Sequence, residues 1–330
     1  MKNKNFCIPN GIEYYMPKEA LEFERLKVNV LKIFKKYKYD YVLPPIFDNL
    51  DNLLNLKSSD IDNETITFLD KSSGSEIGIR ADITPQIAKI DFQITHGKGN
   101  ARFAYMGDIL RLSSNLFDRK NPYQIGAEHF GNVSKSTDIE IIKLMIEIIS
   151  LSGEKKIIIE LGNLSIINNI LTTLELNDKN KSMLIDLINL KSITEIKSFF
   201  KFHNLQKTKL NLIIDLINVS GDIMVLKEIK NILKKYKVNA ETKINELNYI
   251  AKSISKHKDL VGIQVDLCEL HSFNYQSDII YTAYVPNFRK EIARGGRYIA
   301  YTTEKNISRY ATGFSLDLKD ILYMSKIGKK

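Results

Sequence analysis

The amino-acid sequence predicts an α+β fold in which helices flank an antiparallel sheet and a helical segment is inserted into the chain. Paired strand-like runs joined by polar turns alternate with amphipathic helices in the first half, a pattern typical of hairpins in an antiparallel sheet. Residues 163–257 instead carry helical periodicity, after which strand-like runs return. We therefore expect one discontinuous core over residues 1–162 and 258–330, with a helical insertion over 163–257.

A helix and a short strand are the first expected elements. Pro17 suits the first turn of a helix, and apolar residues from Phe23 to Tyr37 recur at helical spacing. The run YVLPPIF then predicts a strand that ends at Pro44 and Pro45, because proline has no N–H to donate to a sheet.

A hairpin, a helix and a second pair of strands follow. NETITFLDKSSGSEIGIRAD contains two strand-like runs around a Ser-Gly turn, and a helix from Pro85 to Ile94 comes next, with Thr84 as its expected N-cap. ARFAYMGDILRL and PYQIGAEHFGNV predict two further strands. STDIEIIKLMIEIISLSG predicts a capped amphipathic helix, which completes the first part of the expected core.

Five strand-like runs lie on the two sides of the insertion. KKIIIELG predicts a strand directly before it, and LVGIQVDLCEL predicts one directly after it. SDIIYTAYV and EIARGGRYIAY predict two more strands, and ATGFSLDLKDILYM predicts a strand that leads into a final helix. We expect these runs to complete the sheet of the core.

Composition indicates a globular protein of the cytoplasm. The chain is 44% hydrophobic and 26% charged, no run approaches the length of a membrane span, and the first residues lack the apolar stretch of a secretory signal. Cys7 and Cys268 lie far apart, and neither they nor the histidines show metal-ligand spacing. We therefore expect reduced cysteines, no metal, no cofactor and no membrane partner.

The formal net charge of +9 does not by itself indicate nucleic-acid binding. Between Leu151 and Leu260, 18 lysines and 12 acidic residues are dispersed at helical spacing, without arginine or interleaved aromatic residues. This pattern is typical of a solvated helix face rather than of an RNA-binding surface. We therefore expect no tRNA partner.

Arginine is rare in this chain, and its positions are informative. There are nine arginines against 39 lysines, and eight of the nine fall in two windows, 80–119 and 289–309. A planar guanidinium suits contacts to carboxylates, phosphates or stacked rings. A site that combines both windows must be assembled by the fold. Arg25 and Arg119 stand apart from the motifs, and we interpret them as surface charges.

Polar residues in the expected sheet form a candidate ligand-binding floor. Arg80 and Asp82 are two residues apart, and Gln124 and Glu128 are four apart, so each pair shares one face of a regular strand. Arg111 is expected on a strand of otherwise apolar residues. Such a mixture of charges suits a zwitterion such as an amino acid. A surface ion pair and a sheet face turned to water are the alternatives.

Five motifs carry a family resemblance. GIRADITPQ, YMGDILR, YQIGAEHFG, ARGGRY and TGFSLDL, in this order, resemble the catalytic core of class II aminoacyl-tRNA synthetases, specifically the histidyl-tRNA synthetase branch. The resemblance covers both halves of the expected core and implies a class II synthetase-like fold. It also implies that YVLPPIF is the first motif, which forms the dimer interface in that class.

The resemblance implies roles for particular residues. Asp82 and Thr84 match positions that hold the amino group of histidine, Gln124 matches another contact to the amino acid, Glu128 lies near the imidazole, and Arg111 matches a contact to ATP phosphate. The two glycines of ARGGRY belong to a strand beside the pocket, where they permit close approach of a ligand, or a bulge as the alternative. The candidate histidine-binding residues are Asp82, Thr84, Arg111, Gln124, Glu128, Tyr275, Gly295, Gly296 and Arg297.

Departures from the synthetase pattern predict that adenylation fails. Asp320 stands where that pattern has an arginine that contacts ATP, and a carboxylate beside a triphosphate is repulsive. His271 replaces an arginine that promotes activation of the amino acid, Gln276 replaces a tyrosine, and Ser113 replaces a glutamate. The sequence ends at Lys330, directly after the last motif, so we expect no anticodon-binding domain.

IPNGIEYYMPKEA, IRADITPQ, YVPNFRKEIARGGRY and ATGFSLDL are similar to the regulatory subunits of ATP phosphoribosyltransferase, the first enzyme of histidine biosynthesis. This resemblance implies a chain without catalytic residues that joins a short catalytic chain, forms a dimer or larger assembly, and transmits inhibition by L-histidine. The alternatives are an active truncated histidyl-tRNA synthetase, another aminoacyl-adenylate ligase, or an accessory protein that binds a different amino acid.

Overall fold

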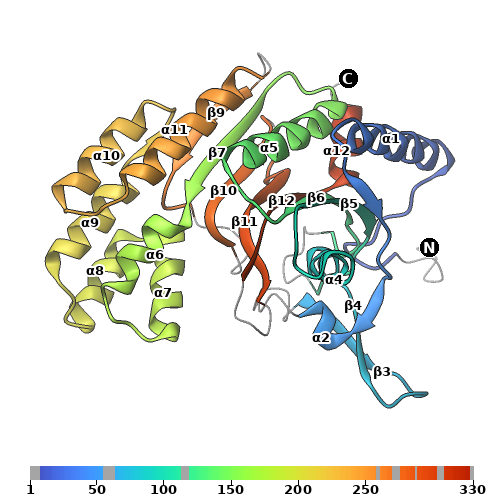
Figure 1. Ribbon diagram of the computed structural model, residues 1–330, viewed down its shortest axis with the longest axis horizontal. Helices are drawn as coiled ribbons and strands as arrows, with labels where there is room; N and C mark the ends of the chain where they lie inside the picture. Colours follow the sequence, from blue (N-terminus) through green and yellow to red (C-terminus); the bar gives the residue numbers. More distant parts are fainter. Residues whose placement is uncertain are drawn as a thin grey trace, which may run out of the picture.

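A nine-stranded sheet forms the centre of the protein in the computed structural model, which describes residues 8–54, 64–112, 119–257, 261–269, 276–286, 288–302 and 308–327 (Figure 1). Its strands, in spatial order, are β1 (Asp40–Val42), β5 (Ala101–Asp108), β6 (Tyr123–Phe130), β12 (Ser308–Asp317), β11 (Ala293–Thr302), β10 (Gln276–Tyr284), β7 (Ile157–Asn163), β9 (Val261–Asp266) and β8 (Ser220–Gly221).

The middle of this sheet is antiparallel, as predicted, but two pairs of strands are parallel. Every neighbouring pair from β5 to β7 is antiparallel. β1 pairs with β5, and β7 with β9, in parallel. A long connection separates the strands of each parallel pair, and such a connection lets the chain return in the same direction, whereas a short hairpin reverses it. The α+β fold class is confirmed, with a mixed sheet.

Helices cover the sheet unequally on its two faces. Helices α1 (Pro17–Lys36), α5 (Lys135–Ile149) and α12 (Leu318–Ile327) lie on one face, here called the α5 face, whereas α4 (Thr84–Thr95) lies on the other, the α4 face (Figure 1). Side chains of β5 alternate accordingly: Ala104 and Met106 join the core under α5, and Phe103 and Tyr105 join the core under α4. Successive residues of β5 are therefore buried in two different cores, one on each face of the sheet.

Of the two long core helices, α1 begins at the predicted residue, and α5 begins one residue before the predicted run, with Ser134 as its N-cap. Pro17 is the first residue of α1, whose buried residues include Phe23 and Phe34. Ser134 precedes α5, and its backbone N–H donates to the Thr137 hydroxyl at 2.7 Å in a capping box. Both helices thereby direct an apolar face onto the sheet.

The predicted hairpin forms a separate three-stranded sheet beside α4. Its strands, in the order β2, β4, β3, are β2 (Phe47–Asn49), β4 (Glu76–Ile79) and β3 (Ile66–Leu69), next to the short helix α2 (Leu50–Leu53). The chain then enters α4 with Ile83 as its N-cap, so the expectation that Thr84 caps the helix is wrong. Thr84 is the first helical residue, and its N–H donates to Asp82 Oδ1 at 2.8 Å.

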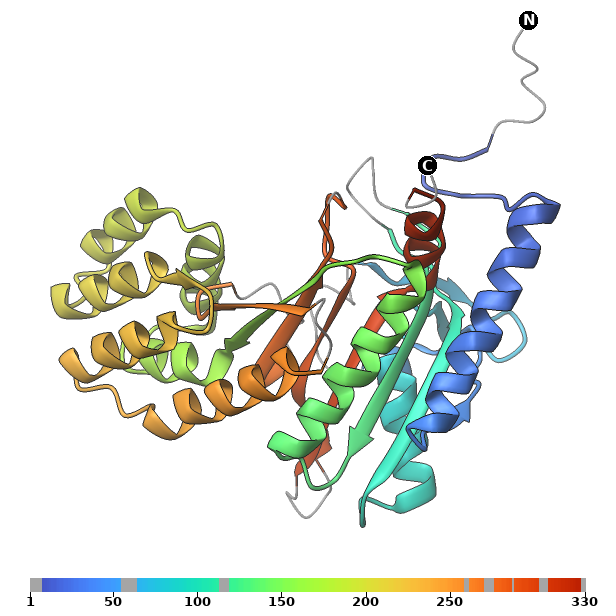
Figure 2. The ribbon, with the colours of Figure 1, turned by 90° about the horizontal axis from the view of Figure 1, so that it is seen from above.

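Six helices lie between β7 and β9 and stand to one side of the sheet (Figures 1 and 2). They are α6 (Leu164–Thr172), α7 (Asp178–Asn189), α8 (Ile193–Phe202), α9 (Lys207–Ile217), α10 (Val225–Lys235) and α11 (Glu241–Ser255). Their buried apolar residues are continuous with the core under α5. A short 3₁₀ helix (Ser150–Ser152) follows α5. Among the described residues, no helix has both the length and the apolar character needed to cross a membrane.

Candidate functional site

The start of α4 and the strand β6 bring four of the predicted residues together on the α4 face. Asp82 and Thr84 lie at the entry to the helix, and Gln124 and Glu128 project toward them from β6. The expected sharing of one face by Gln124 and Glu128 is confirmed. The expectation that Arg80 and Asp82 lie on a strand is wrong, because β4 ends at Ile79. The turn after the strand, rather than the strand itself, positions the Asp82 carboxylate.

Asp82 presents a buried hydrogen-bond acceptor. Gln124 Nε2 donates to Asp82 Oδ1 at 3.0 Å, while Gln124 Oε1 accepts from the N–H of Ile83 at 2.8 Å, so the amide is held in one orientation. The Asp82 residue is only 2% exposed. Within the described residues, its Oδ2 is buried and accepts no hydrogen bond. A buried carboxylate oxygen without a donor is costly, so this atom is suited to bind a cationic or N–H-bearing group of a ligand.

Glu128 forms the second polar group of the site. Its oxygens accept from the hydroxyls of Tyr105 at 3.3 Å and Tyr298 at 2.9 Å, and Tyr105 also lies 3.2 Å from the Thr84 hydroxyl. Burial raises the pKa of the Glu128 carboxyl to about 8, with the nearby charge of Asp82 acting in the same direction. Glu128 is therefore largely protonated at neutral pH, and the site can donate as well as accept a proton there.

Two glycines beside this cluster, one on β6 and one on the neighbouring strand β12, make room for its side chains. A Cβ on Gly313 would overlap the Glu128 carboxylate, and a Cβ on Gly126 would overlap the Tyr105 hydroxyl. The sequence analysis missed Tyr105 and Tyr298 as partners of Glu128. Tyr105 could have been predicted from its strand: it lies two residues after Phe103, which pairs with Glu128, so its side chain is on the same face as that of Glu128.

The predicted residues of β11 do not all reach this cluster. Gly295 faces α5, where a Cβ would collide with the ring of Tyr281 and the backbone of Gly313. Close packing therefore explains why this position has no side chain. Gly296 lies on the same side of the strand as Tyr298, which contacts Glu128. Tyr275 lies outside the described residues.

Arg297 lies on the α5 face, away from Glu128. Its Nε donates to Asp138 of α5 at 3.0 Å, its Nη2 to Glu246 of α11 at 2.6 Å, and its Nη1 to Asp278 of β10 at 3.0 Å. Burial acts to lower the pKa of Arg297, but Asp138 and Glu246 together raise it above its ordinary value, and the guanidinium stays charged. The Asp138 side chain is 0% exposed. Arg297 thus joins the core to the helical segment, and the structure does not bring it into the cluster of Asp82 and Glu128.

Two of the four arginines in the first window, Arg80 and Arg111, donate to backbone carbonyls. Arg111 follows β5 instead of lying on a strand, because the strand ends at Asp108. Its Nε donates to the carbonyl of Ala81 at 3.0 Å and lies 3.4 Å from Glu64, so Arg111 supports the chain immediately before Asp82. Buried Arg80 donates to several backbone carbonyls, including that of Asp108 at 2.9 Å. Burial lowers the pKa of Arg80.

Asp320 is neutralised by cations of this chain. Arg119 Nη1 donates to Asp320 Oδ1 at 2.8 Å, and Lys290 Nζ is 3.0 Å from Asp320 Oδ2. Arg119 also pairs with Asp317, and it bonds Glu13 at 2.9 Å. The interpretation of Arg119 as a surface charge is wrong, since its side chain is only 12% exposed. Arg25, by contrast, is exposed as expected.

Known protein families match this sequence over nearly its whole length. The sequence model described as histidyl-tRNA synthetase matches residues 11–321, in agreement with the class II synthetase-like core. An ATP phosphoribosyltransferase regulatory subunit from Methylococcus capsulatus is 32% identical over 325 residues, which cover 98% of this chain and 80% of that relative. The chain therefore belongs to the histidyl-tRNA synthetase family and, within it, to the ATP phosphoribosyltransferase regulatory subunits. The predicted family is confirmed.

Solved structures share the fold at low sequence identity. An ATP phosphoribosyltransferase regulatory subunit/histidyl-tRNA synthetase from Bacillus halodurans superposes with a TM-score of 0.82 at 19% identity, covering 98% of this chain and 84% of that chain. A chain from an ATP phosphoribosyl transferase complex of Thermotoga maritima gives a TM-score of 0.68 at 18% identity, covering 93% and 98%. At these identities the likeness establishes the fold alone.

Proposed function

We propose that this chain is the regulatory subunit of an ATP phosphoribosyltransferase, in the first step of histidine biosynthesis. In this role it binds a short catalytic chain, activates it, and mediates its feedback inhibition by L-histidine. It does so in the cytoplasm, as a dimer or larger assembly, without catalytic residues of its own. The observation that carries the proposal is the 32% identity with a regulatory subunit along 98% of the chain.

The geometry around Asp82 supports histidine as the effector. The free, buried Oδ2 of Asp82 can accept from the α-ammonium group of an amino acid, and the fixed amide of Gln124 lies beside it. Glu128 offers a proton at neutral pH, which suits a nitrogen of an imidazole ring. An ammonium group and an imidazole at the two ends of one small ligand match histidine. Arg297 is not assigned to this site, since it faces α5.

The ion pairs around Asp320 support the absence of adenylation. A triphosphate requires cations that are free to neutralise it. Arg119 and Lys290 are instead bound to carboxylates of this chain. ATP binding is therefore opposed in two ways: by the negative charge of Asp320, and by the pairing of the nearby cations with carboxylates. Histidine-dependent exchange between ATP and pyrophosphate by the purified chain would support an active synthetase or ligase instead.

Reconstitution tests the proposal. Phosphoribosyl transfer by a short-form catalytic chain is measured alone, with this chain, and with this chain plus histidine. We expect activation by the chain and loss of activity on adding histidine; no change in either measurement would refute the regulatory role.

Asp82→Asn tests the pocket separately. The amide keeps the shape of the side chain and an oxygen for Gln124, but it removes the charge that attracts an ammonium group. We expect activation to persist while the histidine concentration needed for inhibition rises about tenfold or more, as for loss of a charged hydrogen bond. Asp186→Asn, at an exposed position of α7, is the matched control and should leave both measurements unchanged. Unaltered inhibition of Asp82→Asn would place the effector elsewhere.

A further inference from the structure

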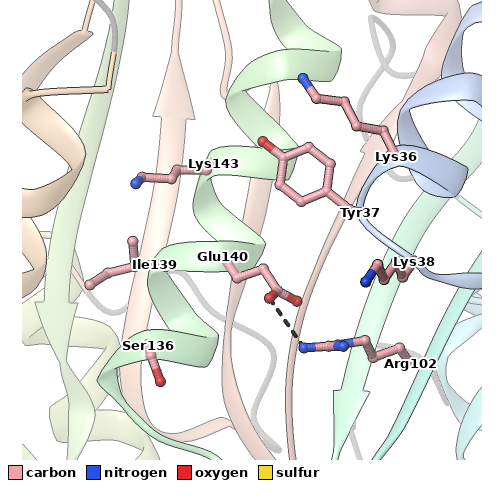
Figure 3. A pocket seen from close by; sticks show the side chains of 8 residues that line it. All are labelled: Lys36, Tyr37, Lys38, Arg102, Ser136, Ile139, Glu140 and Lys143. Atoms are coloured by element: carbon pink, nitrogen blue, oxygen red, sulfur yellow. Dashed lines mark hydrogen bonds and ion pairs between the residues drawn. The ribbon is translucent and has the colours of Figure 1, made fainter.

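A basic cavity lies on the α5 face of the sheet, away from the Asp82 site. It has a volume of about 500 Å³ and lies between the end of α1, strand β5 and helix α5 (Figure 3). Four cationic side chains line it, Lys36, Lys38, Arg102 and Lys143, against one carboxylate, Glu140. A cavity of this size is within the range of small-molecule sites. Its excess of positive charge calls for an anion.

The carboxylates near the cavity are already occupied. Glu140 Oε1 accepts from the Tyr39 hydroxyl at 3.0 Å, and its Oε2 accepts from Arg102 at 3.2 Å. Glu147 is bonded by Lys36 at 2.7 Å. The contact with Glu140 orients Arg102 at the wall of the cavity, whereas Lys36 is largely exposed at its rim. They leave no carboxylate oxygen of Glu140 without a donor.

Two ammonium groups of the cavity have no carboxylate partner among the residues that the structure describes. In the described part of the chain, neither Lys38 nor Lys143 takes part in an ion pair. Lys143 is only partly exposed, whereas Lys38 is exposed in the turn that follows α1. The two residues come from different elements and lie on different sides of the cavity (Figure 3). The Lys143 ammonium is directed away from Lys38 in Figure 3, and the flexible lysine stems allow both groups to turn toward one anion.

We propose that this cavity binds a phosphate-bearing small molecule, with Lys38 and Lys143 as its principal contacts and Arg102 and Lys36 as supporting cations. A phosphate group carries about two negative charges at neutral pH and several acceptor oxygens, so it can use donors from several directions. A single carboxylate would leave most of the positive charge unmatched. The proposal does not depend on the regulatory function, because it uses residues of the opposite face of the sheet.

Inorganic pyrophosphate is the probe for this site. It is titrated into the intact chain by calorimetry and by backbone amide NMR. We expect saturable binding that weakens as salt is added, with amide shifts concentrated at residues 36–38 and 136–143. Citrate, which carries carboxylates in place of phosphates, should bind more weakly. Shifts centred on Arg119 or Asp82, or citrate binding as tight as that of pyrophosphate, would overturn the assignment.

A double variant identifies the contacts. Lys38→Ala with Lys143→Ala should weaken pyrophosphate binding about tenfold or more, the effect of losing charged hydrogen bonds. Lys197→Ala with Lys201→Ala, on exposed positions of α8, makes the same change of net charge far from the cavity. Its binding should stay within about twofold of that of the unmodified chain, since distant surface charges are screened. Equal weakening in both double variants, or no saturable binding at millimolar pyrophosphate, would refute the site.

Discussion

The Arg297 cluster and the Asp82 site, on opposite faces of the central sheet, hold buried charge in opposite ways. On the α5 face, Arg297 is surrounded by three carboxylates, and one of them, Asp138, also accepts from Thr312. On the α4 face, and within the described residues, Asp82 keeps a buried oxygen without a donor, and Glu128 accepts from tyrosine hydroxyls instead of from a cation. A satisfied charge cluster joins elements, whereas an unsatisfied one is suited to a ligand. Strands β11 and β12 contribute residues to both: Arg297 and Thr312 to the charge cluster, and Tyr298 and Gly313 to the surroundings of Glu128.

Removal of Arg297 should give the largest effect on stability. Arg297→Leu leaves Asp138, which is wholly buried, together with Glu246 and Asp278, without their shared cation. Loss of one partner from a buried ion pair costs about 3–5 kcal/mol of unfolding free energy. Urea unfolding of the variant measures the loss. Arg25→Leu, at an exposed position, should change the unfolding free energy by no more than about 0.5 kcal/mol.

A second variant covers the case in which Arg297→Leu does not fold. Arg297→Lys keeps the positive charge but loses the planar fork that reaches carboxylates from three elements. We expect an intermediate loss of stability. A stability equal to that of the unmodified protein would show that the carboxylates need only a point charge, and the contrast between the two faces would then be weaker.

Glu128→Gln should change how stability depends on pH. The folded-state pKa of Glu128, about 8, lies above its ordinary value of 4.5, so the folded protein binds more protons between these values. The contribution of Glu128 to stability is fully present below pH 4.5 and is lost as the pH rises to about 8. Relative to Glu128→Gln, the unmodified protein should lose on the order of a few kcal/mol across this range. Parallel curves of unfolding free energy against pH for the two proteins would contradict the raised pKa.

The sequence predicted the α4 face better than the α5 face. Gln124 and Glu128 follow from the period of a strand, and Asp82 and Thr84 follow from a motif that is local in the chain. Arg297 was assigned to the pocket because its strand runs beside it. A strand presents alternate residues to opposite faces, and the motif alone does not say which residue faces the ligand.

Contacts between distant segments account for the remaining errors. Arg119 meets Asp320 only because the chain brings together residues about 200 positions apart, and no local pattern marks that pairing. The parallel pair of β7 and β9 likewise depends on how the chain returns after six helices. Local periodicity predicts the elements and their buried faces, while the pairing of charges across elements is decided by the tertiary fold.

Thr312→Val offers the finest test of the contrast between the faces. The Thr312 hydroxyl donates to Asp138 Oδ1 at 2.9 Å on the α5 face, while the adjacent Gly313 abuts Glu128 on the α4 face. Valine keeps the shape of threonine and removes one hydrogen bond to a buried carboxylate that Arg297 still neutralises, so we expect a loss of about 1.5 kcal/mol of unfolding free energy, the low end for a hydrogen bond to a charged group. Because the strand itself is unaltered, histidine binding measured by calorimetry should stay unchanged. Weaker histidine binding in this variant would mean that the two faces are energetically coupled through β12, and that the charge cluster under α5 does more than hold the elements together.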